Sequence, residues 1–189
     1  MKITDGLEML ELKTNMMGRT SAFFPTLIWD SQSAILVDTG YPGMLPQLRE
    51  AVDQTGVGIS RLNRIIITHH DMDHIGNLAS ILQEPGGQIR VMAYREEIPY
   101  INGEKRPLKL AQFEDNLDAL TEDQRAVYER MKAGFENGFA PVDQSLSDGQ
   151  ELPFCGGITV IHTPGHTIGH ISLYLRHSKI LISKSSFIG

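Results

Sequence analysis

Short apolar runs alternate with segments of helical period along most of the chain. Strands are expected where apolar and polar residues alternate, or where a brief apolar run is continuous. Seven segments show this pattern: residues 7–13, 20–29, 34–37, 64–68, 157–163, 171–176 and 179–183. Apolar residues at helical spacing predict one helix from Leu45 to Val52 and another that begins at Ile75. Strand followed by helix, twice in succession, is typical of a layered α/β fold.

Residues 96–148 differ from the rest of the chain because they are rich in charge and carry one clear helical segment, residues 121–132. Thr121 is a suitable N-cap for that helix, and Glu122 and Asp123 fall in its first turn. We interpret this segment as a helical insert in a single domain of residues 1–189. Its aromatic residues either pack the helices together, which is the preferred interpretation, or cover a site as a lid: Tyr94, Tyr100, Phe113, Tyr128 and Phe135.

Composition argues against several classes of function. The net charge is −6 and no cluster of Lys or Arg is present, so nucleic acid is not an expected partner. The single cysteine, Cys155, cannot form an internal disulfide and is interpreted as a small apolar filler. No apolar stretch is long enough to span a bilayer, and the N-terminus lacks the apolar core of a signal peptide. We therefore expect a cytoplasmic protein, away from membranes, that acts on a small-molecule substrate.

The sequence THHDMDH, directly after the fourth predicted strand, is dense in side chains that bind metals. In extended chain, alternate residues point the same way, so His69, Asp71 and Asp73 are expected to converge. His70 would then point elsewhere, and His74 would turn back toward the site from the next helix. Imidazole and carboxylate groups together suit zinc, and also manganese or iron. The alternative is a polar, hydrogen-bonded surface turn.

A second histidine-rich stretch, HTPGHTIGH, also follows an apolar strand. Pro164 and Gly165 form a turn that exposes His166. A lone histidine in such a loop is usually an ordinary surface residue. Because both loops follow strand ends, we expect the two to converge on one site.

These stretches, in this order and spacing, resemble the metallo-β-lactamase superfamily of metal-dependent hydrolases over residues 34–182. The resemblance rests on LVDTG, THHDMDHIG and TPGHTIGH. It implies a four-layer αββα sandwich with the metals at one edge of the two sheets. It also implies hydrolysis by a metal-bound hydroxide.

The resemblance assigns roles residue by residue. His69 corresponds to the first ligand of the family's His-x-His-x-Asp-His motif, and His166 to the histidine that completes the first metal site. Asp73 and His74 correspond to ligands of the second metal, and Asp73 would also steer the hydroxide. Asp38 resembles the buried aspartate that orients ligands from beneath the site, although it can also be a simple turn residue.

Two departures from the family pattern change the expected metal site. Asp71 stands where the motif has its middle histidine, and its harder oxygen donor favours manganese or iron relative to zinc. Ser185 stands where the family has a bridging aspartate, with Lys184 beside it. The family's last histidine and its terminal strand and helix would lie beyond Gly189. One or two Zn²⁺ are therefore expected, with Mn²⁺ or Fe²⁺ as alternatives.

Two functions follow from this pattern. The first is metal-dependent hydrolysis of a small ester, lactone or thioester. The second is a truncated or degenerate, non-catalytic metal-binding member of the same fold. Lack of the terminal strand would expose a sheet edge, which predicts a homo-oligomer formed through that edge. A metal-independent hydrolase has little support because no Gly-x-Ser-x-Gly elbow is present.

Overall fold

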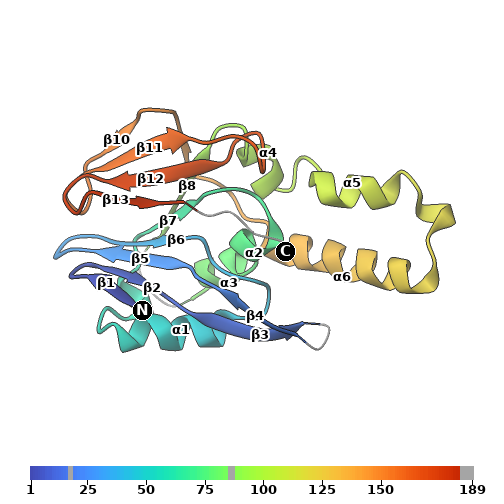
Figure 1. Ribbon diagram of the computed structural model, residues 1–189, viewed down its shortest axis with the longest axis horizontal. Helices are drawn as coiled ribbons and strands as arrows, with labels where there is room; N and C mark the ends of the chain where they lie inside the picture. The colour runs from blue at the N-terminus through green and yellow to red at the C-terminus, as the bar shows by residue number, and fades with distance from the viewer. Residues whose placement is uncertain (17–18, 85–87, 184–189) are drawn as a thin grey trace.

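The computed structural model describes residues 1–16, 19–84 and 88–183, and its main feature is a pair of sheets packed face to face (Figure 1). The larger sheet has the strand order β1-β2-β5-β6-β7-β8-β9, and the smaller has the order β10-β11-β12-β13. The strands of the larger sheet are β1 (Lys2–Thr4), β2 (Leu7–Met9), β5 (Thr26–Trp29), β6 (Ala34–Val37), β7 (Arg64–Ile67), β8 (Arg90–Tyr94) and β9 (Gln144–Leu146). Those of the smaller sheet are β10 (Glu151–Leu152), β11 (Ile158–His162), β12 (Ile171–Leu175) and β13 (Ile180–Ile182). A separate hairpin pairs β3 (Leu12–Met16) with β4 (Arg19–Phe23).

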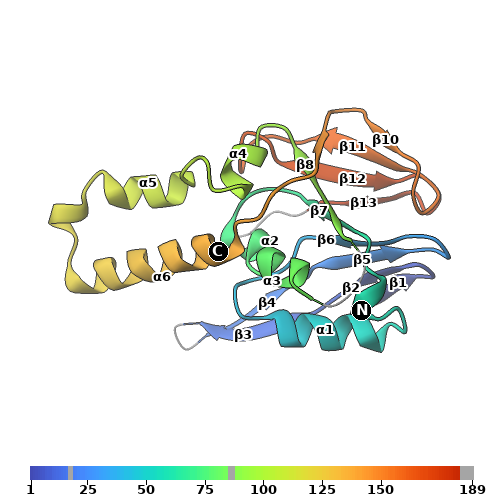
Figure 2. The ribbon, with the colours of Figure 1, turned by 180° about the vertical axis from the view of Figure 1, so that it is seen from behind.

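Three helices, α1 (Leu45–Gln54), α2 (Met72–Ile75) and α3 (Leu78–Leu82), lie on the face of the large sheet that is turned away from the small sheet (Figures 1 and 2). The other helices are α4 (Ile98–Ile101), α5 (Leu108–Glu114) and α6 (Glu122–Gly138), and short 3₁₀ turns are η1 (Ile59–Arg61) and η2 (Leu117–Ala119). None of the described helices combines the length and apolar composition needed to cross a lipid bilayer. The α/β fold class predicted from the sequence is confirmed.

The large sheet is buried on both faces, which explains why its central strands are continuous apolar runs. Ile35 and Val37 face the small sheet, where they share one apolar cluster with Val160. Leu36, between them, belongs to the cluster on the helix side. Burial of both faces stabilises the sandwich by the hydrophobic effect, at roughly 25 cal/mol per Å² of apolar surface.

The order of the strands brings the functional loops to one edge. β6, β7 and β8 are parallel neighbours, so their carboxyl ends lie together. In an open α/β sheet, this is the edge where ligands usually bind. The connection from β11 to β12 reaches the same edge, because Ile171 N donates to Thr68 O across the two sheets at 3.1 Å.

Several predicted boundaries were wrong for identifiable reasons. Residues 20–29 form two strands, because Pro25 has no N–H to donate and the chain passes there from the β3–β4 hairpin to the large sheet. Residues 7–13 also divide, between β2 and β3. The helix predicted from Ile75 begins earlier, at Met72, and is interrupted between α2 and α3. β1, β8, β9 and β10 were not predicted.

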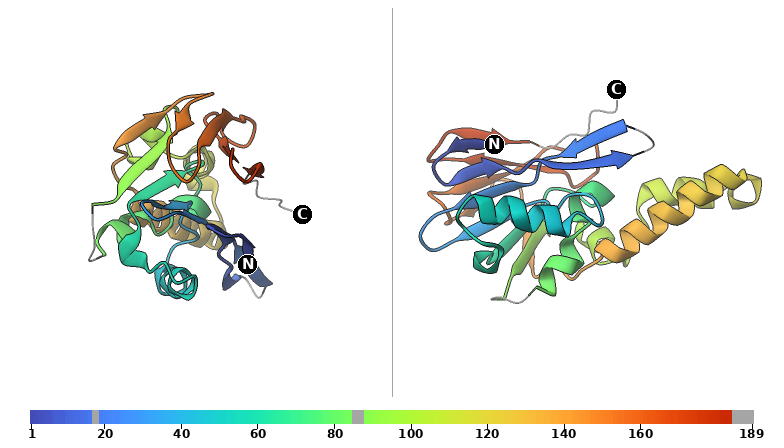
Figure 3. Two further views of the ribbon diagram at one scale, coloured as in Figure 1. Left: turned by 90° about the vertical axis from the view of Figure 1, so that its left-hand side faces the viewer. Right: turned by 90° about the horizontal axis from the view of Figure 1, so that it is seen from below.

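Within the predicted insert, α5 and α6 form a helical hairpin that extends away from the sheets (Figure 3), whereas residues 144–146 form β9 of the large sheet. Its long helix α6 begins after Thr121 with a capping box completed by Gln124, as the sequence predicts for the cap, and continues past residue 132 to Gly138. Glu114 fixes α5 against α6, since its Oε1 accepts from Tyr128 Oη at 2.9 Å while Oε2 pairs with Arg106.

The base of the hairpin rests on α2 through glycines. A Cβ at Gly134 would lie 2.2 Å from Met72 Sδ, and one at Gly138 would lie 2.8 Å from Ile75 O. Only glycine allows α6 to approach α2 this closely. The hairpin is therefore anchored beside the loop that follows β7.

Candidate metal centre

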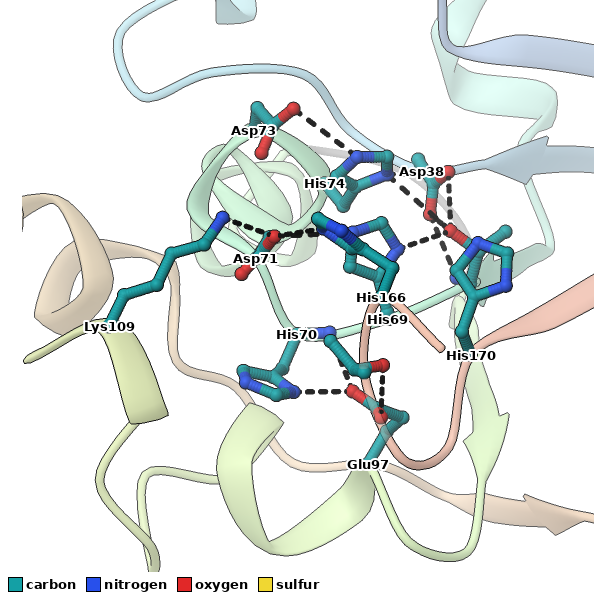
Figure 4. Close-up of polar contacts among 12 residues, drawn as sticks. Asp38, His69, His70, Asp71, Asp73, His74, Glu97, Lys109, His166 and His170 are labelled. Atoms are coloured by element: carbon teal, nitrogen blue, oxygen red, sulfur yellow. Dashed lines mark hydrogen bonds and ion pairs between the residues drawn. The ribbon is translucent and has the colours of Figure 1, made fainter. Parts of the chain in front are cut away.

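Two loops far apart in the sequence bring His69, Asp71 and His166 together (Figure 4). One ligand atom from each lies within 4.8 Å of the other two. Asp71 Oδ2 is 2.6 Å from His166 Nε2 and 3.5 Å from His69 Nε2. His69 and Asp71 are buried, whereas His166 is more open. The convergence of the two histidine loops that the sequence predicts is thus present in the structure.

A chain of hydrogen bonds fixes the orientation of His69. Asp38 Oδ1 accepts from Thr68 N at 2.8 Å, and Oδ2 accepts from Thr68 Oγ1 at 2.9 Å. Because the Thr68 hydroxyl donates its single proton to Asp38, it accepts from His69 Nδ1, at 3.1 Å. Nδ1 therefore carries the ring proton, and the lone pair of His69 lies on Nε2.

The Nε2 atom of His69 is the strongest sign of a metal site. It is buried and has no hydrogen-bond partner among the described residues. Burial lowers the pKa of His69 to about 4, so its ring is neutral at pH 7. A buried nitrogen lone pair without a partner is costly unless a cation or donor binds it. The residues present therefore fit a divalent cation held by His69, Asp71 and His166.

Asp71 is charged and shared among several groups. Burial favours its neutral form, but the hydrogen bonds and charges around it, among them the ammonium group of Lys109, outweigh burial and lower the pKa of Asp71 well below its usual range. Lys109 Nζ, on α5, lies 2.6 Å from Asp71 Oδ2. The oxygen that faces His69 and His166 therefore also faces an ammonium group from the insert.

Asp73 and His74 lie beside this group, on α2. His74 Nδ1 is 2.9 Å from Asp38 Oδ2, and its Nε2 is 3.3 Å from Asp73 Oδ2. Burial disfavours the imidazolium, but Asp38 and Asp73 outweigh it and raise the pKa of His74 to about 10. The two nitrogens of His74 are thus each held by a carboxylate. Its ring centroid lies 3.8 Å from that of His69.

Asp73 lies beside the site, but not because of the strand alternation that the prediction assumed. The extended backbone ends at Asp71, which is the N-cap of α2, so the alternation of side chains does not continue to Asp73. Asp73 reaches the neighbourhood because the first helical turn rotates it there. Ser185, which stands where the family has a bridging aspartate, and Lys184 beside it lie outside the described residues.

Asp38 lies directly after β6, beside His69 and His74 (Figure 4). Its backbone has φ of +61°, a left-handed conformation that is uncommon outside glycine and that aspartate tolerates better than most residues. The conformation turns the chain just after β6. It leaves the Asp38 carboxylate facing both Thr68 and His74.

Glu97 is a structural centre of the site that the sequence analysis missed. Its side chain is fully buried and accepts from His70 N at 2.8 Å, Thr167 Oγ1 at 2.7 Å and Gly169 N at 2.8 Å. These bonds tie the loop after β7 to the loop that carries His166. Glu97 follows β8, and because that strand was not predicted, no sequence signal marked this glutamate.

Two further histidines border the site. His70 points away from the group of His69, Asp71 and His166, as the alternation predicts. Its Nδ1 lies 2.5 Å from Glu97 Oε2, and its ring stacks on Tyr100. His170, the last residue of TPGHTIGH, was not selected from the sequence. Its Nδ1 is 2.9 Å from Thr163 Oγ1, and its ring centroid lies 5.0 Å from that of His69.

Comparison with known proteins agrees with this fold. The family model described as the metallo-beta-lactamase superfamily matches residues 24–183. The chain therefore belongs to this superfamily, a family of metal-dependent hydrolases.

Two curated relatives and one solved structure illustrate the similarity. The probable metallo-hydrolase YflN of Bacillus subtilis is 28% identical over 174 residues, which cover 89% of this chain and 61% of YflN. A hydroxyacylglutathione hydrolase from Shewanella sp. is 26% identical, with coverage of 80% and 45%. A metallo-beta-lactamase family protein from Thermus thermophilus aligns with a TM-score of 0.73 at 22% identity, covering 95% of this chain and 59% of that one. The chain thus spans about three fifths of YflN and less than half of the Shewanella protein.

Proposed function

We propose that this chain is a metal-dependent hydrolase of a small ester, lactone or thioester. It would hold a divalent cation, Zn²⁺ in the first instance, on His69, Asp71 and His166. The observation that carries the proposal is the buried Nε2 of His69, which has no partner in the described chain and faces Asp71 and His166. Hydrolases named among the relatives support the reaction class.

A cation bound at this position lowers the pKa of a water molecule and polarises a substrate carbonyl. The chain's own residues prepare that chemistry. Asp38 and Thr68 keep the proton of His69 on Nδ1, so that Nε2 is free to bind. Glu97 holds the two ligand loops in register.

Asp73 is the residue we assign to orienting the attacking water. Burial favours its neutral form, but His74 outweighs burial and lowers the pKa of Asp73, so the carboxylate is charged and accepts hydrogen bonds. Its side chain remains 25% exposed, unlike that of Asp71 at 3%, and it is accessible from the cavity beside the site. Asp73 and His74 are also the proposed ligands of a second cation, which would displace the proton that His74 holds.

The carboxylate of Asp71 makes Mn²⁺ or Fe²⁺ the alternatives to Zn²⁺. A net charge of −6 supports a small molecule, and not a nucleic acid, as the substrate. We also propose a cytoplasmic location.

The test is metal content measured together with hydrolysis. The chain is purified without chelator, its metals are counted by elemental mass spectrometry, and ester, lactone and thioester substrates are assayed. We expect at least one metal per chain, lost in His166→Ala, and hydrolysis that disappears with the metal. Metal binding without hydrolysis of any of these substrates would favour the non-catalytic alternative. Absence of metal would refute the proposal.

A further inference from the structure

Beside the metal group lies a cavity of about 630 Å³ between α2 and the base of the helical insert. Its volume is within the range of small-molecule sites. The lining residues are Tyr41, Met72, Asp73, Lys109, Val127, Arg130, Met131 and Phe135. Most of the wall is apolar, and the charged groups are one acid, Asp73, and two cations, Lys109 and Arg130.

Lys109 connects this cavity to the metal group. It lines the cavity, and its Nζ lies 2.6 Å from Asp71 Oδ2. Figure 4 shows it reaching toward Asp71 from the side of the insert. Its side chain is still 45% exposed, so the ammonium group also faces open space. The contact with Asp71 demonstrates that an anionic oxygen fits against Lys109 at this place.

Arg130, on α6, provides a second positive charge in the lining of the cavity. It is exposed, and it lies close enough to Tyr41 to act on its hydroxyl: burial raises the pKa of Tyr41, and Arg130 opposes that rise. Glu114 holds α5 against α6, so the two cations are presented by a braced pair of helices. Close packing at Gly134 sets the distance between α6 and Met72, which also lines the cavity.

We infer that this cavity binds the non-reacting part of the substrate, and that this part joins an apolar body to an anionic group, a carboxylate or a phosphate. Met72, Val127 and Met131 contact the apolar body. Lys109 and Arg130 bind the anion, which offsets the repulsion that Asp71 and Asp73 exert on a negatively charged substrate. The inference rests on the proposed function, because it assigns the substrate of the same site. Binding energy from this remote group would position the reacting bond.

The test measures binding without turnover, so that it is independent of hydrolysis. Hexanoate, hexyl phosphate and hexanamide are titrated into the purified chain by calorimetry. These probes share an apolar body and differ in charge. We expect the two anions to bind at least about tenfold more tightly than the amide, as charge-assisted hydrogen bonds require. The ratio of their dissociation constants shows whether carboxylate or phosphate is preferred.

Four variants locate the binding groups. Lys109→Met and Arg130→Met should each weaken the anions about tenfold and leave hexanamide unchanged. Val127→Trp fills the apolar wall and should weaken all three probes together. Lys132→Met removes a positive charge from the same helix outside the cavity and should change none of them. Arg130 is not among the proposed ligands or their contacts, so its variant is informative even where Lys109→Met alters metal content.

Two results would overturn the inference: anion binding that is unaffected by both Lys109→Met and Arg130→Met, which would place the anion on the metal, or equal binding of anions and amide. These results are distinguishable from failure of the proposed function. A chain that hydrolyses uncharged esters without preference for anions would keep the function and lose this cavity's role. A chain that binds the anions through Lys109 and Arg130 without hydrolysis would keep this cavity's role and lose the proposed function.

Discussion

Asp71 and His166 are 95 residues apart in the sequence, yet Asp71 Oδ2 lies 2.6 Å from His166 Nε2. One residue follows a strand of the large sheet, and the other lies in a connection of the small sheet. The contact therefore reports the packing of the two sheets at their common edge. A change that shifts one sheet against the other should therefore change the distance between these two atoms even where each sheet keeps its own structure. Four predictions follow from the geometry around this contact.

Asp71→His should change which metal the chain prefers. The substitution replaces a hard oxygen donor by an imidazole nitrogen and removes the anion that Lys109 contacts. We expect the ratio of zinc to manganese affinity to rise by about tenfold or more, measured by competition with a chromophoric chelator. Asp115→His, at the exposed end of α5, is the control for adding a histidine and should leave the ratio unchanged. An unchanged ratio in Asp71→His would exclude Asp71 as a ligand.

Glu97→Gln should loosen the site without touching a proposed ligand. The carboxylate of Glu97 accepts hydrogen bonds from His70 N, Thr167 Oγ1 and Gly169 N. In the variant, the NH₂ group of the glutamine would face at least one of these donors. Burying such a mismatch costs about 1–3 kcal/mol, seen as a lower free energy of unfolding in urea. Metal affinity should fall as well, because His69 and His166 lose their common tether.

Glu96→Gln is the matched control for this variant. The neighbouring glutamate contacts Arg95, and its Oε2 has no hydrogen-bond partner in the described structure. Its amide variant should therefore keep both stability and metal affinity close to those of the parent. Equal losses in the two variants would show that the tether formed by Glu97 has no special role.

Gly76→Ala should disrupt the loop that carries the ligands. A Cβ at this position would lie 2.4 Å from Pro42 N and 2.6 Å from Met72 O, both backbone atoms that cannot move aside as a side chain does. We expect a loss of several kcal/mol in the free energy of unfolding, together with weaker metal binding. Gly43→Ala is the comparison: its added Cβ meets nothing within 4 Å, and only its φ of +81° costs about 1 kcal/mol. Similar losses in both variants would contradict the close packing at Gly76.

The chelator-treated chain should lose stability on mild acidification because of His69. Burial lowers the pKa of this histidine from 6.5 to about 4 in the folded chain, so the unfolded chain binds the extra proton first. The contribution of His69 to the free energy of unfolding is complete above pH 6.5. It decreases as the pH falls from 6.5 through about 4, by roughly 3 kcal/mol in total. His74, whose pKa is raised to about 10, is protonated in both states below pH 6.5 and does not oppose the effect there.

Urea unfolding of the chelator-treated chain between about pH 6.5 and pH 4.5, inside the window that the two pKa values of His69 define, measures this dependence. His69→Gln should flatten the curve, whereas His177→Gln, on the exposed turn after β12, should leave it as steep as in the parent. A slope that survives in His69→Gln would assign the acid sensitivity to another group.

Much of the site was accessible from the sequence because its proposed ligands follow apolar strands. Residues 65–67 are three isoleucines, apolar and β-branched, so the strand is recognisable, and His69 and Asp71 have a fixed position at its end. The alternation of side chains correctly turned His70 away. It failed at Asp73, because the same loop begins a helix at Met72 and local pattern alone does not mark that change.

The chain by itself determined the α/β class, the two histidine loops and the cap at Thr121, since each depends on residues close together in sequence. Only the tertiary structure decided the rest. The hydrogen bonds of Glu97 and the contact of Lys109 with Asp71 join segments 27 to 72 residues apart. The direction of the helical hairpin depends on glycines that permit close packing. Contacts of that range arise from how whole elements pack, and no periodicity within a single segment records them.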